Sequence, residues 1–128
     1  MTMKMYHLDQ AAQSLVLKAL QRDPESLSQA YKMRMAVAYG LERFWGETLR
    51  LNGPKATYWQ ETWNELVEIL AEAGLALPND RPSDVEGIKK MAGKLWAIPV
   101  EKQRIAIAVL TQLCDSLVWW TQRYKGSR

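Results

Sequence analysis

Proline and glycine divide this sequence into segments whose length and pattern suit helices. The breaks fall at residues 23–24, 52–54 and 74–82 and at Pro99. Between them apolar residues recur every three or four positions, which is the periodicity of a helix with one buried face. No segment alternates apolar and polar residues over more than a few positions, so we predict no strands.

We therefore predict an all-α fold, a compact bundle of about five helices in which residues 1–128 form a single domain. The last helix contains an unbroken apolar run over residues 105–110, so we expect it to be long and central in the bundle. We expect residues 1–6 and 125–128 to be flexible. The helices are predicted over about residues 8–21, 24–51, 57–73, 83–96 and 99–124.

Local signals define several of these helix ends. Asp23, which precedes a proline, is a typical helix start. Thr57 and Ser83 each begin a capping-box pattern, in which a hydroxyl and a side chain three residues later close the first turn. Gly74 is expected to end the third helix because glycine adopts the left-handed conformation found there.

The composition excludes several classes of protein. The chain has one Cys and one His, too few for an internal disulfide or for a zinc site. No apolar run approaches the roughly 20 residues of a membrane span, and no signal peptide is recognisable. We therefore expect a cytoplasmic protein with no membrane partner.

The residues that usually carry catalysis are not arranged for it. His7 lies at the start of the chain, and Cys114 lies between apolar residues of the last helix, where a buried and inert thiol is expected. The sequence contains no phosphate-binding loop, no dinucleotide-binding glycine motif and no nucleophile elbow. We expect a protein that is not an enzyme and that has no cofactor and no metal site.

Acidic residues are concentrated in one segment. Residues 56–79 contain four Glu and no Lys or Arg, which leaves 17 basic and 10 acidic residues in the rest of the chain. The spacing places all four carboxylates on one helix face, which we call the acidic strip. This strip is either a solvated helix face or a surface that docks a basic region of this protein or of a partner. Its members are Glu61, Glu65, Glu68 and Glu72.

Basic residues gather on the second predicted helix. At 100° per residue, Lys32, Tyr39, Arg43 and Arg50 share a narrow face, and small residues lie between them. Long cationic side chains beside an aromatic ring suit the backbone of a polyanion, with the ring as a stacking surface. The alternative is a solvated polar face. Arg34 points to the apolar side, where we expect an internal ion pair or an interface contact.

Further cations extend this basic character to the last two helices. We expect them to contribute phosphate contacts that do not depend on sequence. They are Lys89, Lys90, Lys94, Lys102, Arg104 and Arg123.

The six Trp residues divide between core and surface. Trp45, Trp59 and Trp63 fall on apolar helix faces and are predicted to be buried, as is Trp120. Trp119 projects with polar residues. It is a candidate anchor for a protein partner or a stacking surface for a base, unless the N-terminal segment covers it.

The last predicted helix resembles the small subunits of CRISPR effector complexes, in particular the type III-B small subunit. The resemblance covers residues 100–125, VEKQRIAIAVLTQLCDSLVWWTQRYK, which run from a polar and basic start through an Ala/Leu-rich middle to an aromatic and basic end. It implies a non-catalytic subunit that stacks head to tail within the complex. Such a subunit holds target or displaced nucleic acid, single-stranded DNA or RNA, without reading its sequence.

Two other functions remain as alternatives. The first is a helical adaptor or dimerisation module with protein partners only, which would use Trp119 and the acidic strip. The second is a transcription regulator, which we disfavour because the connection over residues 74–82 is too long for a helix-turn-helix. The CRISPR subtype, the strand contacted, the copy number and the oligomeric state of the isolated chain stay open.

Overall fold

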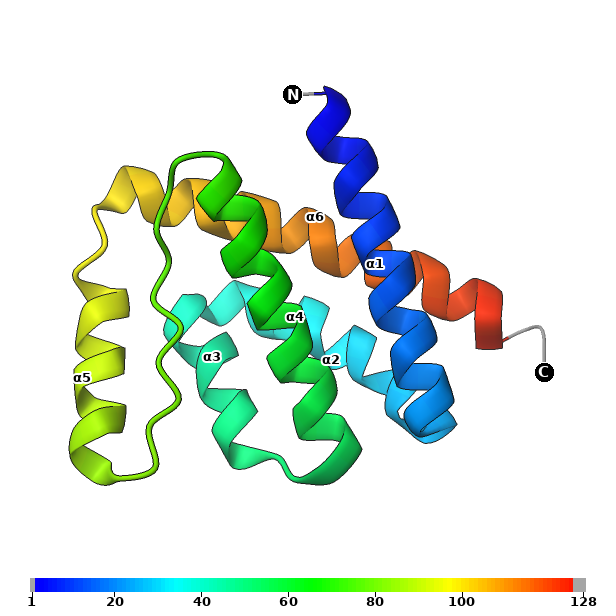
Figure 1. Cartoon of the computed structure of the whole chain (residues 1–128), viewed down its shortest axis with the longest axis horizontal. Coiled ribbons are helices and arrows are strands. Elements are labelled where there is room, and N and C mark those ends of the chain that lie inside the picture. The colour runs from blue at the N-terminus through cyan, green and yellow to red at the C-terminus, as the bar shows by residue number, and fades with distance from the viewer. Residues whose placement is uncertain (1, 126–128) are drawn as a thin grey trace.

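The computed structural model describes residues 2–125, and the side chains of residues 7–125, and it confirms an all-α fold (Figure 1). The described chain contains six α-helices and two short 3-10 helices, joined by loops, and it contains no strand. In chain order the elements are α1 (Thr2–Arg22), η1 (Pro24–Ser28), α2 (Gln29–Ala36), η2 (Val37–Tyr39), α3 (Leu41–Arg50), α4 (Gly53–Glu72), α5 (Val85–Trp96) and α6 (Val100–Lys125).

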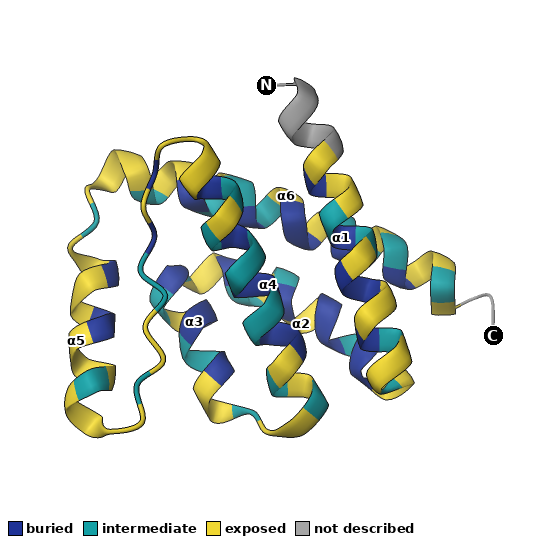
Figure 2. Cartoon of the chain, in the orientation of Figure 1, coloured by how far each residue is buried: buried dark blue, intermediate teal, exposed yellow. Residues whose placement is uncertain are grey.

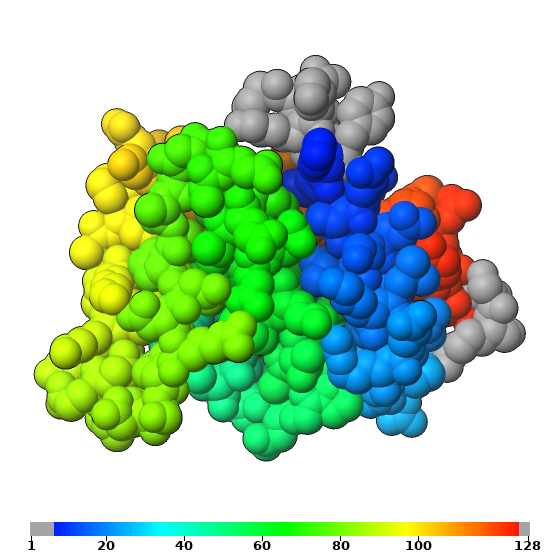
Figure 3. Space-filling view, in the orientation of Figure 1, coloured from blue at the N-terminus to red at the C-terminus, as the bar shows by residue number. Residues whose placement is uncertain are grey.

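The long helix α6 organises the bundle. It runs along the long axis of the molecule and packs against α1, α2, α3 and α4 (Figure 1). Helices α1 and α4 cross in front of it, and together with the connection after α4 they cover the face seen in Figure 3. Helix α5 stands at one edge beside α3. Only one face of α6 is buried, however, because Ile105 on its other face is 52% exposed.

The core is built around tryptophan, as predicted for three of the six. Trp45, Trp59 and Trp63 are 1%, 2% and 0% exposed, and the buried residues of the helices face one another across the interior (Figure 2). The ring of Phe44 lies 4.8 Å from that of Trp59 and 6.2 Å from that of Trp63, centroid to centroid. Trp120 is only half-buried, and its indole N–H donates to Asp9 of α1 at 3.2 Å.

The single long helix predicted over residues 24–51 is wrong. This segment begins with η1, which Asp23 caps as expected. The helical path then breaks at Gly40, between η2 and α3. Gly40 has φ 97° and ψ 174°, a conformation essentially restricted to glycine. Its N–H donates to the carbonyl of Val37, and its own carbonyl accepts from Phe44, so one residue ends η2 and begins α3.

Other helix ends were predicted with mixed success. Gly74 does end α4, with φ 85°, and its N–H and that of Leu75 donate to carbonyls in the last turn. The capping box at Thr57 is wrong because α4 begins at Gly53, and the Thr57 hydroxyl donates to the Gly53 carbonyl. The N-cap of α5 is Asp84 rather than the adjacent serine, and it accepts from the Gly87 N–H at 2.8 Å.

The two ends of the chain are helical as far as they are described. Helix α1 begins at Thr2, several residues before the predicted start, and α6 continues to Lys125. Met1 and residues 126–128, for which we expected flexibility, lie outside the described residues. None of the described helices combines the length and the apolar character needed to cross a bilayer.

Candidate nucleic-acid interface

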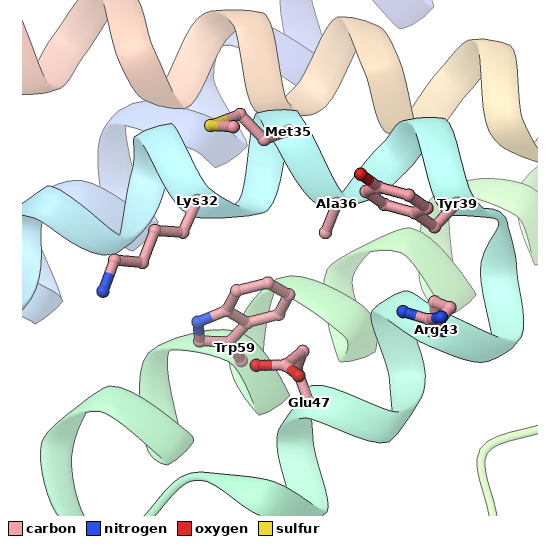
Figure 4. Close-up of a pocket in the computed structure, with 7 residues that line it drawn as sticks. All are labelled: Lys32, Met35, Ala36, Tyr39, Arg43, Glu47 and Trp59. Atoms are coloured by element: carbon pink, nitrogen blue, oxygen red, sulfur yellow. The ribbon is translucent and has the colours of Figure 1, made fainter.

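An open groove lies between α2 and α3, with α4 beneath it (Figure 4). Gly40 creates it, because the break at that residue turns α3 out of the line of α2 and leaves a space between the two helices. We call it the α2–α3 groove. Its cavity volume is about 280 Å³, and its lining residues are Lys32, Met35, Ala36, Tyr39, Arg43, Glu47 and Trp59.

The floor of the groove is fixed by buried contacts. The Trp59 side chain reaches it from α4, and its indole N–H donates to the Gln29 side-chain oxygen of α2 at 2.8 Å. Gln29 is 1% exposed, so this hydrogen bond is shielded from water. Phe44 packs against the Trp59 ring at 4.8 Å. The floor is therefore an almost fully buried indole held by one hydrogen bond and by ring packing.

The walls of the groove expose apolar and aromatic surface. Met35 is 72% exposed and Tyr39 is 69% exposed, so both present apolar surface to a ligand in the groove. The guanidinium of Arg43 lies over the Tyr39 ring, 5.4 Å from its centroid. Such a cation–π contact holds both side chains at the groove mouth.

The groove carries more positive than negative charge. Lys32 and Arg43 are exposed on opposite walls, and among the described residues Glu47 is the only acidic one that lines the groove. Hydrogen bonds from Arg50 hold the pKa of the Glu47 carboxyl below its ordinary value; burial opposes this, and the charges of Arg50, Arg43 and Lys32 support it. Glu47 is therefore ionised at neutral pH and is already paired with Arg50.

The residues predicted to share one basic helix face are arranged differently from the prediction. They lie on three successive helical elements, because Gly40 interrupts the helix. Lys32, Tyr39 and Arg43 nevertheless meet around the α2–α3 groove. Arg50 does not line it; instead its guanidinium binds the Glu47 carboxylate at 2.6 to 3.0 Å.

The remaining predicted cations are spread over the molecule. Lys89 and Lys90 are exposed on α5, whereas Lys94 donates to Asp80 at 2.6 Å. Helix α5 and the C-terminal end of α6 lie at opposite edges of the molecule, with α2 and α3 between them (Figure 1). The other three predicted cations are exposed on α6. Lys102 and Arg104 lie near its start, and Arg123 lies near its end.

The acidic strip is in part internally paired. Glu61 accepts two hydrogen bonds from Arg22 of α1, both at 3.0 Å. Glu65 is half-buried, and burial raises the pKa of its carboxyl; Glu68 and Glu72 act in the same direction, and Lys18 opposes them. Glu68 and Glu72 themselves are exposed. The strip thus docks a basic residue of its own chain at one end and is solvated at the other.

Trp119 is 53% exposed, as the polar side of its helix suggested. The guanidinium of Arg123 lies 5.6 Å from the Trp119 ring centroid and 5.7 Å from that of Trp120.

Arg34 forms the expected ion pair, with Asp115 at 2.5 Å, but the two side chains are 43% and 60% exposed. Arg34 was predicted to point to the apolar side of its helix, and its ion pair is instead open to solvent.

Several exposed apolar side chains along α5 and at the start of α6 were not anticipated from the sequence. Helical spacing groups Val85 and Ile88 with the buried Ala92 and Leu95 on one side of α5, but they are 78% and 38% exposed. Trp96 and Val100 are 68% and 64% exposed. The reason is that α5 lies at the edge of the bundle and packs mainly against α3, so a narrower face than expected is buried.

Met35 and Glu47 were also missed as groove residues. A signal for them exists in the spacing, because Met35, Tyr39, Arg43 and Glu47 follow one another at intervals of four. That spacing places them along one side of a helix, and the turn at Gly40 then wraps this side around the groove.

The other chemically distinctive residues lie outside the groove. Cys114 is buried in α6, and burial raises the pKa of its thiol to about 12. Among the described residues no three His, Cys, Asp or Glu side chains are grouped so that they could hold a metal ion. The groove itself offers two cations, an exposed aromatic ring and one carboxylate, which together suit a ligand that is anionic and planar.

Comparison of the chain with known protein families, with curated proteins and with solved structures found no match. Within the described residues, the meeting of Lys32, Tyr39 and Arg43 around one groove is the feature that points most directly to a ligand.

Proposed function

We propose that this chain is a non-catalytic subunit that binds single-stranded DNA or RNA without sequence preference through the α2–α3 groove. The observation that carries the proposal is the convergence of Lys32, Tyr39 and Arg43 on one concave site. Proteins that hold single strands combine cations for the backbone with aromatic rings for the bases. The groove offers both within one site of about 280 Å³.

The chemistry of the groove favours binding over sequence reading. Lys and Arg contacts to phosphate fix the position of a strand but carry no information about its bases. Stacking on a tyrosine ring is likewise tolerant, since every base has a flat face. The exposed cations of α5 and α6 would extend such contacts beyond the groove, chiefly Lys89, Lys90, Lys102 and Arg104.

The biological setting that we propose is a CRISPR-type ribonucleoprotein effector complex in the cytoplasm. The support is the resemblance of residues 100–125 to the small subunits of such complexes. Head-to-tail stacking of copies would need two unlike surfaces that complement each other. The exposed Glu68 and Glu72 of α4 and the exposed Lys89 and Lys90 of α5 are a pair of that kind.

A second candidate is a helical adaptor that binds protein only. Two observations favour it: Trp119 is 53% exposed, and Trp96 is 68% exposed beside Val100. Exposed tryptophans are frequent anchors in protein interfaces. For this candidate, Trp119→Ala or Trp96→Ala would abolish co-purification of a partner, whereas changes in the α2–α3 groove would not.

The experiment that tests the first proposal is a titration of a fluorescently labelled single-stranded oligonucleotide followed by anisotropy. We expect a Kd of about 1 to 100 μM at physiological salt that weakens steeply between about 50 and 200 mM salt. Lys32→Glu combined with Arg43→Glu should weaken binding by about tenfold or more at low salt. Unchanged binding by this variant would contradict the proposal.

A matched control separates the groove from overall charge. Lys55 is exposed on the first turn of α4 and does not line the groove. Lys55→Glu and Arg43→Glu change the net charge by the same amount. We expect Lys55→Glu to retain nearly full affinity and Arg43→Glu to lose it. Equal losses would mean that the binding reflects only net charge.

A further inference from the structure

The α2–α3 groove is concave, and its size limits what enters it. Pockets for small ligands usually measure about 300 to 1,000 Å³, and this one measures about 280 Å³. A space of that size suits a planar ring with part of its sugar. A duplex keeps its bases stacked and paired, so it presents only phosphates to such a groove.

The aromatic and cationic side chains at the mouth are arranged to hold a flat ring. The Arg43 guanidinium lies 5.4 Å from the centroid of the Tyr39 ring, and Tyr39 as a residue is still 69% exposed. Unpaired bases stack both on aromatic rings and on guanidinium planes. Met35, which is 72% exposed on the α2 wall, adds polarizable apolar surface that adapts to the shape of a ligand.

The charges in the groove separate a place for phosphate from a place for neutral donors. Lys32 lies toward the end away from Tyr39 and Arg43 (Figure 4). The carboxylate of Glu47 lies on the α3 side, where it is ionised and paired with Arg50, and its remaining acceptor positions suit neutral hydrogen-bond donors rather than a phosphate. Base amino groups and ribose hydroxyls are such donors.

We propose that the α2–α3 groove receives one unstacked nucleobase of a single strand, which stacks on the Tyr39–Arg43 pair while its neighbouring phosphate contacts Lys32. Glu47 accepts a hydrogen bond from the base or the sugar. This inference rests on the proposed function and goes further, because it makes the groove a nucleotide site rather than one part of a basic surface. Single strands should therefore bind more tightly than duplexes with the same number of phosphates.

The test uses NMR spectra of the isotope-labelled full chain, in which each of the six Trp residues contributes one indole N–H signal. AMP is added as the probe, and ribose 5-phosphate serves as the control that has the phosphate but no base. We expect AMP to shift the Trp59 signal, because this side chain lines the groove, and to leave the Trp119 signal in place. Ribose 5-phosphate should cause a much smaller shift of Trp59. Equal shifts with the two probes, or no shift of Trp59 with AMP, would overturn the inference.

Two variants extend the test to oligonucleotides. Tyr39 is exposed, so its replacement leaves the core intact. Tyr39→Ala should weaken single-strand binding by about tenfold, whereas Tyr39→Phe, which keeps the ring, should stay within about twofold of wild type. If Lys32→Glu with Arg43→Glu weakens binding but Tyr39→Ala does not, the nucleotide site is wrong and the proposed function stands. If no variant changes binding, both are wrong.

Discussion

The guanidinium of Arg43 lies over the ring of Tyr39, 5.4 Å from its centroid, across the turn made by Gly40. The two residues belong to different elements, because Tyr39 ends η2 and Arg43 lies in the first turn of α3. Their contact therefore depends on the backbone conformation of the residue between them. It also ties the break in the helix to the site that we propose for nucleic acid.

The first prediction concerns that backbone. Gly40→Ala should lower the free energy of unfolding by about 1 to 3 kcal/mol, because φ 97° with ψ 174° is strained for any residue with a side chain. Urea denaturation measures this change. Oligonucleotide binding should weaken as well, since the groove depends on the same turn.

A second glycine supplies the control. Gly46 lies inside α3, and a Cβ there meets only a flexible side-chain oxygen of Glu42 at 3.7 Å. Gly46→Ala should therefore raise stability by about 0.4 to 1 kcal/mol. If the two variants have the same stability, our explanation of the break is wrong.

Glu65 should be a destabilising residue at neutral pH. Burial and the charges of Glu68 and Glu72 raise the pKa of its carboxyl, so folding favours the protonated form. Glu65→Gln should stabilise the protein by a few tenths of a kcal/mol at neutral pH. The gain should be full above the raised pKa and should vanish as the pH falls below the ordinary value of 4.5, where the wild-type carboxyl is also neutral.

The control for Glu65 is Glu61, which accepts two hydrogen bonds from Arg22. Glu61→Gln should give no gain, because it removes the charge that pairs with this arginine. Thermal unfolding measured from neutral pH to below pH 4.5 compares the stability of the two variants. A Glu65→Gln variant that is less stable than wild type at neutral pH would contradict the prediction.

Tyr58 should tolerate the loss of its hydroxyl. The residue is fully buried, and its hydroxyl makes no hydrogen bond of good geometry within the described part of the chain, although it lies close to Thr121. Thr121 donates instead to the Leu117 carbonyl at 2.7 Å. Tyr58→Phe should be neutral or stabilising by up to about 1 kcal/mol in urea denaturation. A loss of more than about 1 kcal/mol would show that the hydroxyl has a partner in solution.

Cys114 should react only when the fold opens. Its thiol is buried and its pKa is raised to about 12 from an ordinary 9.0, which lowers the thiolate fraction about a thousandfold. Labelling with a disulfide reagent should be slow in buffer and immediate in guanidinium chloride. Fast labelling of the native protein would show that α6 opens far more readily than its packing suggests.

The architecture could be predicted from the sequence to a large extent, and the site only in part. Apolar periodicity is repeated over many turns, so it predicted the all-helical fold and the burial of Trp59 and Trp63 correctly. The break at Gly40 could not be predicted, because one glycine inside a periodic helix costs only about 1 kcal/mol and is commonly tolerated. Tertiary packing decides between a continuous helix and a turn at such a position.

That break also explains which site predictions changed. Lys32, Tyr39 and Arg43 were grouped as one helix face, and they meet instead around a groove that requires the turn. Arg50 was placed on the same face, but its nearest charge, Glu47, lies one turn away and binds it. Pairings of this kind depend on side-chain conformations, which a helical projection does not contain.

Photochemical crosslinking tests the central claim most directly, because it shows where a strand lies on the protein. A short single-stranded oligonucleotide that carries a photoreactive uracil is bound to the full chain and irradiated, and the attached residues are identified by mass spectrometry. We predict crosslinks at Tyr39 and at its exposed groove neighbour Met35. Crosslinks confined to α5 and α6, with none in the groove, would contradict the account.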